Sequence, residues 1–192
     1  MSPRKGLDLN DILQAAEEIA NTKGVHSVTL ASVAKKLGIR SPSLYNHIDG
    51  LQDLLNKLAI FGYDELYESM VNAAIGVYGD EAIKRMGKVY ITFARNRPGL
   101  YEATFYASGQ QDDDIQMAGF KIVELFVQVF KIKGFDDTKA IHIVRGLRSI
   151  FHGFASLEQK GEFGLPLDLD ESYQIMIDTY LRGIETLTKE SD

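Results

Sequence analysis

The 192-residue chain has no cysteine and no tryptophan. Without cysteine it cannot form disulfides, use a thiolate in catalysis or hold zinc through cysteine ligands. Its longest stretches without a charged residue are 11 residues, whereas a membrane-spanning helix needs about 20 apolar residues. The first residues, MSPRKGLDLND, lack the apolar run of a secretory signal. We therefore expect a soluble, cytoplasmic protein that does not enter a membrane.

Aromatic residues are almost missing from the first part of the chain. Residues 1–60 contain one aromatic side chain, Tyr45, and the other 18 of the 19 Tyr and Phe residues follow. Charge divides in the same way, because residues 1–60 hold seven Lys/Arg against six Asp/Glu, and residues 61–192 hold 14 against 21. These differences predict two domains, residues 1–50 and residues 51–192. An acidic body repels DNA, so only the first domain is expected to approach it.

Apolar residues recur with helical spacing along the whole chain, and no useful length shows the alternation of a strand. The pattern predicts an all-α protein of about nine helices, with an N-terminal three-helix domain. A first helix is expected between Asp8 as N-cap and Gly24 as a left-handed C-terminal residue. The later helices are expected near residues 50–78, 80–96, 98–106, 112–133, 136–160 and 170–189.

Residues 29–48 have the pattern of a helix-turn-helix. Thr29 is a good N-cap for one helix, and Gly38 ends it. Ser41 as N-cap, with Pro42 in the first turn, favours the start of a second helix. Leu44 and Ile48, four residues apart, must face the core. The side chains expected to point outward are those of Ser43, Tyr45, Asn46 and His47.

In a helix-turn-helix the second helix enters the major groove of DNA. A tyrosine there can donate to a phosphate and lay its ring against a sugar or a thymine methyl, while the other polar side chains offer donors and acceptors. The alternative is that Tyr45 packs half-exposed over the first helix, because a helix-turn-helix pattern alone also occurs without DNA binding.

The run ILQAAEEIANTKGVHSVTLASVAKKLGIRSPSLYNHIDGLQDLL, within residues 7–66, closely resembles the DNA-binding domain of tetracycline-repressor-type (TetR family) regulators. Its core is VTLASVAKKLG, two further residues, and SPSLYNHI. The resemblance implies double-stranded DNA as the partner. It also implies that the following positions touch DNA: Thr29, Arg40, Ser41, Ser43, Tyr45, Asn46 and His47.

Two positions depart from the family pattern. The family commonly has a lysine at the start of the fourth helix, where this chain has Leu51, and often a basic residue early in the second helix, where it has Ala31. Two phosphate contacts are therefore expected to be missing. Other basic residues, namely Arg4, Lys5, Lys35 and Lys36, are candidates to replace them.

The resemblance implies a C-terminal body that dimerises and holds an effector pocket. Residues 145–173 resemble the class of such bodies named for a Trp-His-Gly motif, with Phe151-His152-Gly153 at that place. Small residues at Gly146, Ser149, Gly153 and Ser156 form a stripe that lets another helix approach closely. The stripe is either the dimer interface or a contact inside one subunit.

The effector pocket is predicted from aromatic residues on the central helices near Arg97-Pro98-Gly99. The predicted lining residues are Phe93, Tyr101, Phe105, Phe120, Phe151 and His152, and such a lining suits a small, largely apolar molecule. Most of the body's aromatics are expected to be core, and a buried His152 is more often a hydrogen-bonded core group than a ligand contact.

No pattern for catalysis or for a cofactor is present. The sequence has no GxSxG, P-loop, GxGxxG or HExxH motif, and its four histidines lack metal-ligand spacing. Asp112-Asp113-Asp114 is a solvated helix start rather than a metal site. We therefore predict no enzyme, no cofactor and no metal.

These observations favour a homodimeric, DNA-binding transcriptional regulator. We expect a repressor that leaves a palindromic operator when a small molecule binds. The alternatives are an all-α enzyme, for which no reactive constellation is found, and a helical protein-interaction module or ligand-binding protein without a role at DNA.

Overall fold

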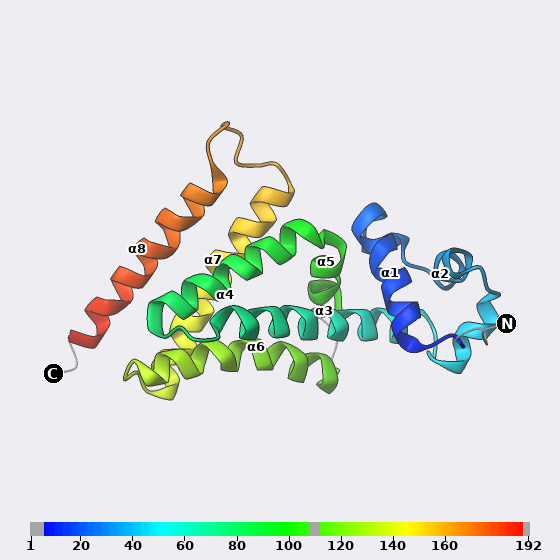
Figure 1. The fold of residues 1–192 in the computed structure, drawn as a ribbon, viewed down its shortest axis with the longest axis horizontal. Helices are drawn as coiled ribbons and strands as arrows, with labels where there is room; N and C mark the ends of the chain where they lie inside the picture. The colour runs from blue at the N-terminus through cyan, green and yellow to red at the C-terminus, as the bar shows by residue number, and fades with distance from the viewer. Residues whose placement is uncertain (1–5, 108–111, 190–192) are drawn as a thin grey trace. The chain divides into compact units, whose positions relative to one another are not determined.

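The computed structural model describes residues 6–107 and 112–189. All regular elements in these ranges are helices, which confirms the all-α prediction (Figure 1). In chain order the elements are α1 (Leu9–Lys23), η1 (Val25–Ser27), α2 (Leu30–Leu37), η2 (Ser41–Asn46), α3 (Leu51–Ala74), α4 (Gly79–Asn96), α5 (Pro98–Ala107), α6 (Asp113–Ile132), α7 (Asp137–Gln159) and α8 (Leu169–Lys189), where η denotes a 3-10 helix.

Three local expectations need correction. The second helix of the helix-turn-helix is a 3-10 helix that starts at Ser41, so Arg40 and not Ser41 is its N-cap. Gly24 does end α1, but its φ of 82° and ψ of 157° lie outside the left-handed helical region. The long third α-helix ends at Ala74, short of the expected residue 78, because Gly76 adopts a positive φ of 76° just beyond it.

The chain divides into two compact units. The first comprises residues 1–65 and 96–119, and the second comprises residues 66–95 and 120–192. Helix α3 contributes residues to both units. Each unit is described below by itself.

In the first unit, the start of α5 docks closely on the end of α1. The Asn21 side-chain oxygen accepts hydrogen bonds from the N–H groups of Gly99 (3.0 Å) and Leu100 (3.1 Å). A Cβ at Gly99 would stand 2.0 Å from the Ala20 carbonyl carbon, so the residue must be glycine for the two helices to approach this closely. Asn21 thereby satisfies backbone donors that the first turn of α5 would otherwise leave unpaired.

In the second unit, α7 and α8 form an antiparallel pair (Figure 1). The Tyr180 hydroxyl of α8 donates to the Ile143 carbonyl of α7 at 2.8 Å. Its oxygen lies 2.0 Å from where a Cβ at Gly146 would stand, so Gly146 makes room for Tyr180.

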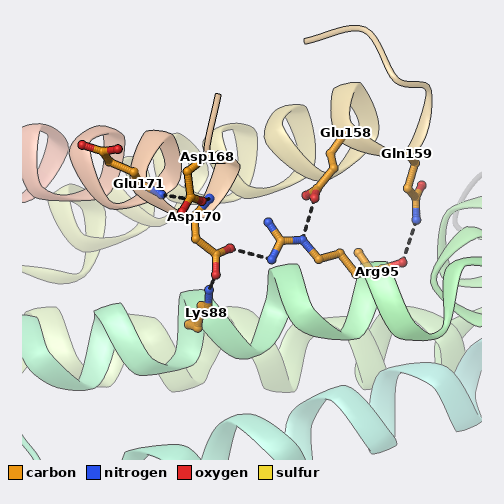
Figure 2. Close-up of polar contacts among 8 residues, drawn as sticks. Lys88, Arg95, Glu158, Gln159, Asp168, Asp170 and Glu171 are labelled. Atoms are coloured by element: carbon orange, nitrogen blue, oxygen red, sulfur yellow. Dashed lines mark hydrogen bonds and ion pairs between the residues drawn. The ribbon is translucent and has the colours of Figure 1, made fainter. Parts of the chain in front are cut away.

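Ion pairs join α4 to both of these helices (Figure 2). Arg95 donates to Glu158 on α7 through Nε at 2.7 Å and to Asp170 on α8 through Nη1 at 2.6 Å. The ammonium of Lys88 also binds Asp170. Hydrogen bonds from Lys88 and then Arg95 hold the pKa of Asp170 below its ordinary value, so this carboxylate stays charged and bridged.

Candidate nucleic-acid interface

The first helix of the helix-turn-helix is capped as its sequence predicts. The Thr29 hydroxyl accepts from the Ser32 N–H at 3.0 Å, and the Ser32 hydroxyl accepts from the Thr29 N–H at 2.9 Å. This reciprocal capping box fixes where α2 begins. The Thr29 hydroxyl also donates to the Ser32 hydroxyl, so its proton serves the cap.

The turn depends on Gly38. Its φ of 67° and ψ of 28° are left-handed helical values, which glycine adopts at little cost. The next N–H, that of Ile39, reaches back to the Ala34 carbonyl at 3.0 Å, and the chain then extends through Arg40. The turn thus brings the α2 helix and the short η2 helix against each other.

The inward and outward faces of η2 follow the predicted pattern. Leu44 is fully buried and Ile48 is 2% exposed, whereas 58% of Tyr45 is exposed. Asn46 and Arg40 are exposed as well. The Tyr45 ring therefore lies outside the core, as both the DNA-contact prediction and the alternative of a half-exposed tyrosine over α1 require.

The polar side chains around η2 have no partners among the described residues. None of the predicted contact side chains after Thr29 makes a hydrogen bond or an ion pair inside residues 6–107 and 112–189: Arg40, Ser41, Ser43, Tyr45, Asn46 and His47. One guanidinium, one amide, one imidazole and three hydroxyls thus gather within eight residues with their hydrogen-bonding capacity unused. That capacity is available to an external polar surface.

Some of the other basic side chains of the first unit form ion pairs within the protein. Lys36 pairs with Glu18 of α1, and Lys57 pairs with Asp53 of α3. Burial opposes the ionisation of Asp53, but hydrogen bonds from Lys57 and from the Asp49 N–H outweigh it and lower its pKa. Lys35 is exposed and, like Arg40, has no ion-pair partner in the described chain. Arg4 and Lys5 lie outside the described residues.

The two positions that depart from the family pattern both face solvent. Ala31 is exposed, and 39% of Leu51 is exposed at the first residue of α3. Neither is needed to fill the core. A lysine or arginine at either position would be exposed and able to contact DNA, but this chain has alanine and leucine there.

The residues predicted to line an effector pocket fall into both units. Tyr101 and Phe105 pair edge to face on α5 in the first unit, with ring centroids 5.0 Å apart. The second unit holds the buried Phe93 and Phe151, the half-buried His152, and Phe120, which is 60% exposed.

The aromatic contacts of Phe151 are extensive. The distance from its ring centroid is 5.6 Å to that of Tyr90, 5.9 Å to that of Phe126 and 6.2 Å to that of Tyr173. Tyr173 was not among the predicted pocket residues. The available signal was that it shares the buried face of α8 with Ile177 and Leu181, at helical spacing.

The four residues of the small-residue stripe differ in their surroundings. Gly146 meets Tyr180 of its own chain, whereas nothing lies within 4 Å of a Cβ placed on Gly153. Ser149 is exposed and donates to the Arg145 carbonyl within α7, and Ser156 is half-buried. A groove of about 670 Å³ is lined by other residues of α7 and α8, among them His142, Ile143, Thr179 and Gly183.

A helix-turn-helix whose polar side chains have no partner among the described residues is typical of DNA-binding regulators. Two family profiles match this chain. The one described as "Bacterial regulatory proteins, tetR family" covers residues 12–58, and the one described as "Tetracyclin repressor-like, C-terminal domain" covers residues 83–180.

Similar whole proteins are also known. The chain is 40% identical over 185 residues to the uncharacterized HTH-type transcriptional regulator YobS of Bacillus subtilis, covering 96% of each. A solved structure of unknown function from Rhodococcus sp. RHA1 matches with a TM-score of 0.84 at 22% identity, covering 95% of this chain and 98% of that one. A TetR variant from Acinetobacter baumannii AYE, in complex with minocycline, matches with a TM-score of 0.71 at 20% identity. That match covers 95% of this chain and 98% of the other.

The chain therefore belongs to the TetR family of helix-turn-helix transcriptional regulators. Members of this family regulate transcription and are not enzymes. In the described part of the chain, no group of acidic or histidine side chains could hold a metal ion. Nor is any helix there both long and apolar enough to cross a membrane.

Proposed function

We propose that this regulator is a homodimeric repressor that leaves a palindromic operator when a small, largely apolar molecule binds its body. The observation that carries the proposal is the set of side chains around η2 that have no partner among the described residues. Arg40, Tyr45 and Asn46 are exposed, so their polar groups can exchange water for an external partner. A cluster of unused donors on a helix-turn-helix suits the phosphates and base edges of a major groove.

Each side chain has a contact that its chemistry suits. Arg40 carries a charge that neutralises a phosphate, and the Tyr45 hydroxyl donates to a phosphate while its ring lies on a sugar or a thymine methyl. Asn46 can pair with a base edge, and Ser41, Ser43 and His47 can donate to the backbone of DNA. Because the Thr29 proton is used in the cap, DNA would meet this residue only through its remaining acceptor capacity.

Dimerisation is proposed through α7 and α8. A second copy can pack in the groove between these helices and over Gly153, where nothing lies within 4 Å of a Cβ. The space over Gly146 is instead filled by Tyr180 of the same chain. A dimer with two-fold symmetry would present two helix-turn-helix segments to the two halves of a palindrome.

Release by a ligand is proposed to act through α3. This helix begins directly after the DNA-contacting segment and continues into the second unit. Two half-sites one turn apart require recognition segments spaced by about 34–36 Å, so a shift of a few ångströms breaks the register. The minocycline complex of a protein with this fold supports a body that accepts a small molecule. The ligand must favour the DNA-free state, and DNA must weaken ligand binding by the same factor.

Gel retardation with the DNA upstream of the protein's own gene tests the proposal. We expect a retarded band that saturates with protein. Unlabelled upstream DNA should compete it away, and a scrambled duplex of equal length should not. Retardation that the scrambled duplex abolishes equally would show non-specific binding and contradict an operator in that region.

A further inference from the structure

Two buried side-chain oxygens in the body have no hydrogen-bond partner within the described chain, Glu158 Oε2 and the Tyr173 hydroxyl. The other carboxylate oxygen of Glu158 is bound by Arg95, whereas Tyr173 has a single polar atom. Tyr173 of α8 is 2% exposed, and its hydroxyl makes no hydrogen bond to any described residue. A buried hydroxyl without a partner destabilises the fold, because it has given up its hydrogen bonds to water. Phenylalanine would give the same ring contacts without that cost, so packing alone does not account for a tyrosine here.

The surroundings of the hydroxyl are aromatic side chains and helix backbone. The Tyr173 ring meets Phe154 edge to face at 5.5 Å and Phe151 at 6.2 Å. Its oxygen lies against α4, only 2.2 Å from where a Cβ at Gly87 would stand. We call Tyr90, Phe126, Phe151, Phe154 and Tyr173 the Tyr173 cluster.

The electrostatic setting favours a neutral ligand. Burial raises the pKa of Tyr173 well above its ordinary value, so the hydroxyl keeps its proton and acts as a neutral donor. Charged groups of α4, α7 and α8 in this unit pair with one another, since Arg95 binds both Glu158 and Asp170, and Lys88 binds Asp170 (Figure 2). No unmatched charge among these residues calls for a charged ligand.

A loop with a glycine at each end, residues 161–164, packs next to the Tyr173 cluster. Phe163 lies on Phe154 with ring centroids 4.9 Å apart. It stands between Gly161 and Gly164, which both have a φ of 67°, and Leu165 just beyond is 72% exposed. Displacing the Phe163 ring would uncover Phe154, whose ring in turn contacts that of Tyr173.

We propose that the Tyr173 hydroxyl is the hydrogen-bonding anchor of the effector site, and that the effector is a flat, neutral molecule with a carbonyl or hydroxyl oxygen. This inference rests on the proposed ligand response and adds to it the anchoring residue and the ligand class. The rings of the Tyr173 cluster would bury the apolar part, and the hydroxyl would donate to the oxygen.

The test compares two small probes of matched shape that differ in one group. α-Methylstyrene has a CH2 group where acetophenone has its carbonyl oxygen, and calorimetric titration at millimolar concentration gives the affinity of each. We expect wild type to bind acetophenone roughly three- to tenfold more tightly, the range of one net hydrogen bond. Tyr173→Phe should bind the two probes equally, with a melting temperature equal to or above that of wild type, because it loses an unsatisfied group.

Tyr180→Phe is the matched control on the same helix. Its hydroxyl is already bonded to Ile143, so this variant should melt at a lower temperature while keeping the probe preference. The inference is overturned if neither probe binds wild type, if wild type shows no preference, or if Tyr173→Phe keeps it. A fall in the melting temperature of Tyr173→Phe would also overturn it, by showing a structural hydroxyl. Operator binding is measured separately, so failure of the DNA-binding proposal leaves this result readable.

Discussion

Arg97 donates two hydrogen bonds to the Glu17 carboxylate, from Nε to one oxygen at 2.6 Å and from Nη2 to the other at 2.8 Å. A third bond, from Nη1 to Glu65 of α3, is 2.6 Å long. Hydrogen bonding to Glu17, and then to Glu65, outweighs burial and raises the pKa of Arg97. One guanidinium thus joins the α4–α5 junction to α1 and α3 within the first unit.

Removing this guanidinium should destabilise the first unit. Arg97→Gln leaves two carboxylates without their cation, and we expect a loss of about 1–3 kcal/mol in the free energy of unfolding. Urea unfolding followed by circular dichroism measures it. Arg85→Gln is the control, because its ion pair with Glu81 lies on an exposed helix face and is worth a few tenths of a kcal/mol. Equal effects of the two changes would contradict the proposed role of Arg97.

A bulky residue at Gly153 should weaken the dimer. Gly153→Leu places four heavy atoms in the proposed helix contact, and overpacking of this kind costs about 1–3 kcal/mol, twice over in a symmetric dimer. Sedimentation equilibrium at micromolar concentration should show more monomer than for wild type. The control is Gly153→Ala, whose Cβ meets open space within the chain. A fully dimeric Gly153→Leu protein would place this residue outside the interface.

Stability should fall with acid in a window set by His152. Burial, followed by the charges of Arg148 and Lys160, lowers the pKa of His152 below its ordinary 6.5. Above pH 6.5 the imidazole is neutral in both folded and unfolded chains, so it adds no pH dependence. As the pH falls below 6.5 the unfolded chain takes up a proton first, and the folded state loses stability until the pH reaches the lowered pKa. Melting temperatures between pH 7 and 5.5 should therefore drop less steeply for His152→Gln. The same replacement at the exposed His142 is the control, and an identical slope for wild type and His152→Gln would refute the assignment.

Restoring a family-type cation should tighten DNA binding. Leu51→Lys puts an ammonium at the exposed first residue of α3, where the family commonly has lysine. Each added phosphate contact should steepen the dependence of log affinity on log salt by about 0.9. The control is Ile75→Lys, which adds the same charge at an exposed position of the second unit. If both lysines change the salt dependence alike, only net charge matters and Leu51 does not face a phosphate.

The sequence was sufficient for features that depend on local chemistry. Helices α4 to α8 begin and end within one residue of their predicted limits, because caps such as Asp136 and breaks such as Gly134 act on the adjacent turn. The outward position of Tyr45 followed in the same way, from two buried neighbours at helical spacing.

Features that depend on contacts between distant residues were not predictable. Periodicity does not reveal that Tyr180 occupies the space over Gly146, or that Arg97 reaches Glu17 across 80 positions of the chain. The same holds for Tyr173, because a tyrosine on a buried helix face becomes notable only when its hydroxyl proves to have no partner. The 3-10 form of η2 also escaped prediction, since six residues are too few to distinguish it from an α-helix.

The most direct test of the account is the salt dependence of operator binding by Arg40→Ala, with Tyr45→Phe measured beside it. Fluorescence anisotropy of a labelled operator gives the affinity at several salt concentrations. Arg40→Ala should bind more weakly and lower the log–log slope by about 0.9 for each half-site, because one phosphate contact is lost there. Tyr45→Phe should lose about 0.5–1.5 kcal/mol for each hydrogen bond at an unchanged slope, and Tyr78→Phe, exposed in the second unit, should match wild type. Wild-type affinity and slope in both Arg40→Ala and Tyr45→Phe would contradict the claim that the side chains around η2 read DNA.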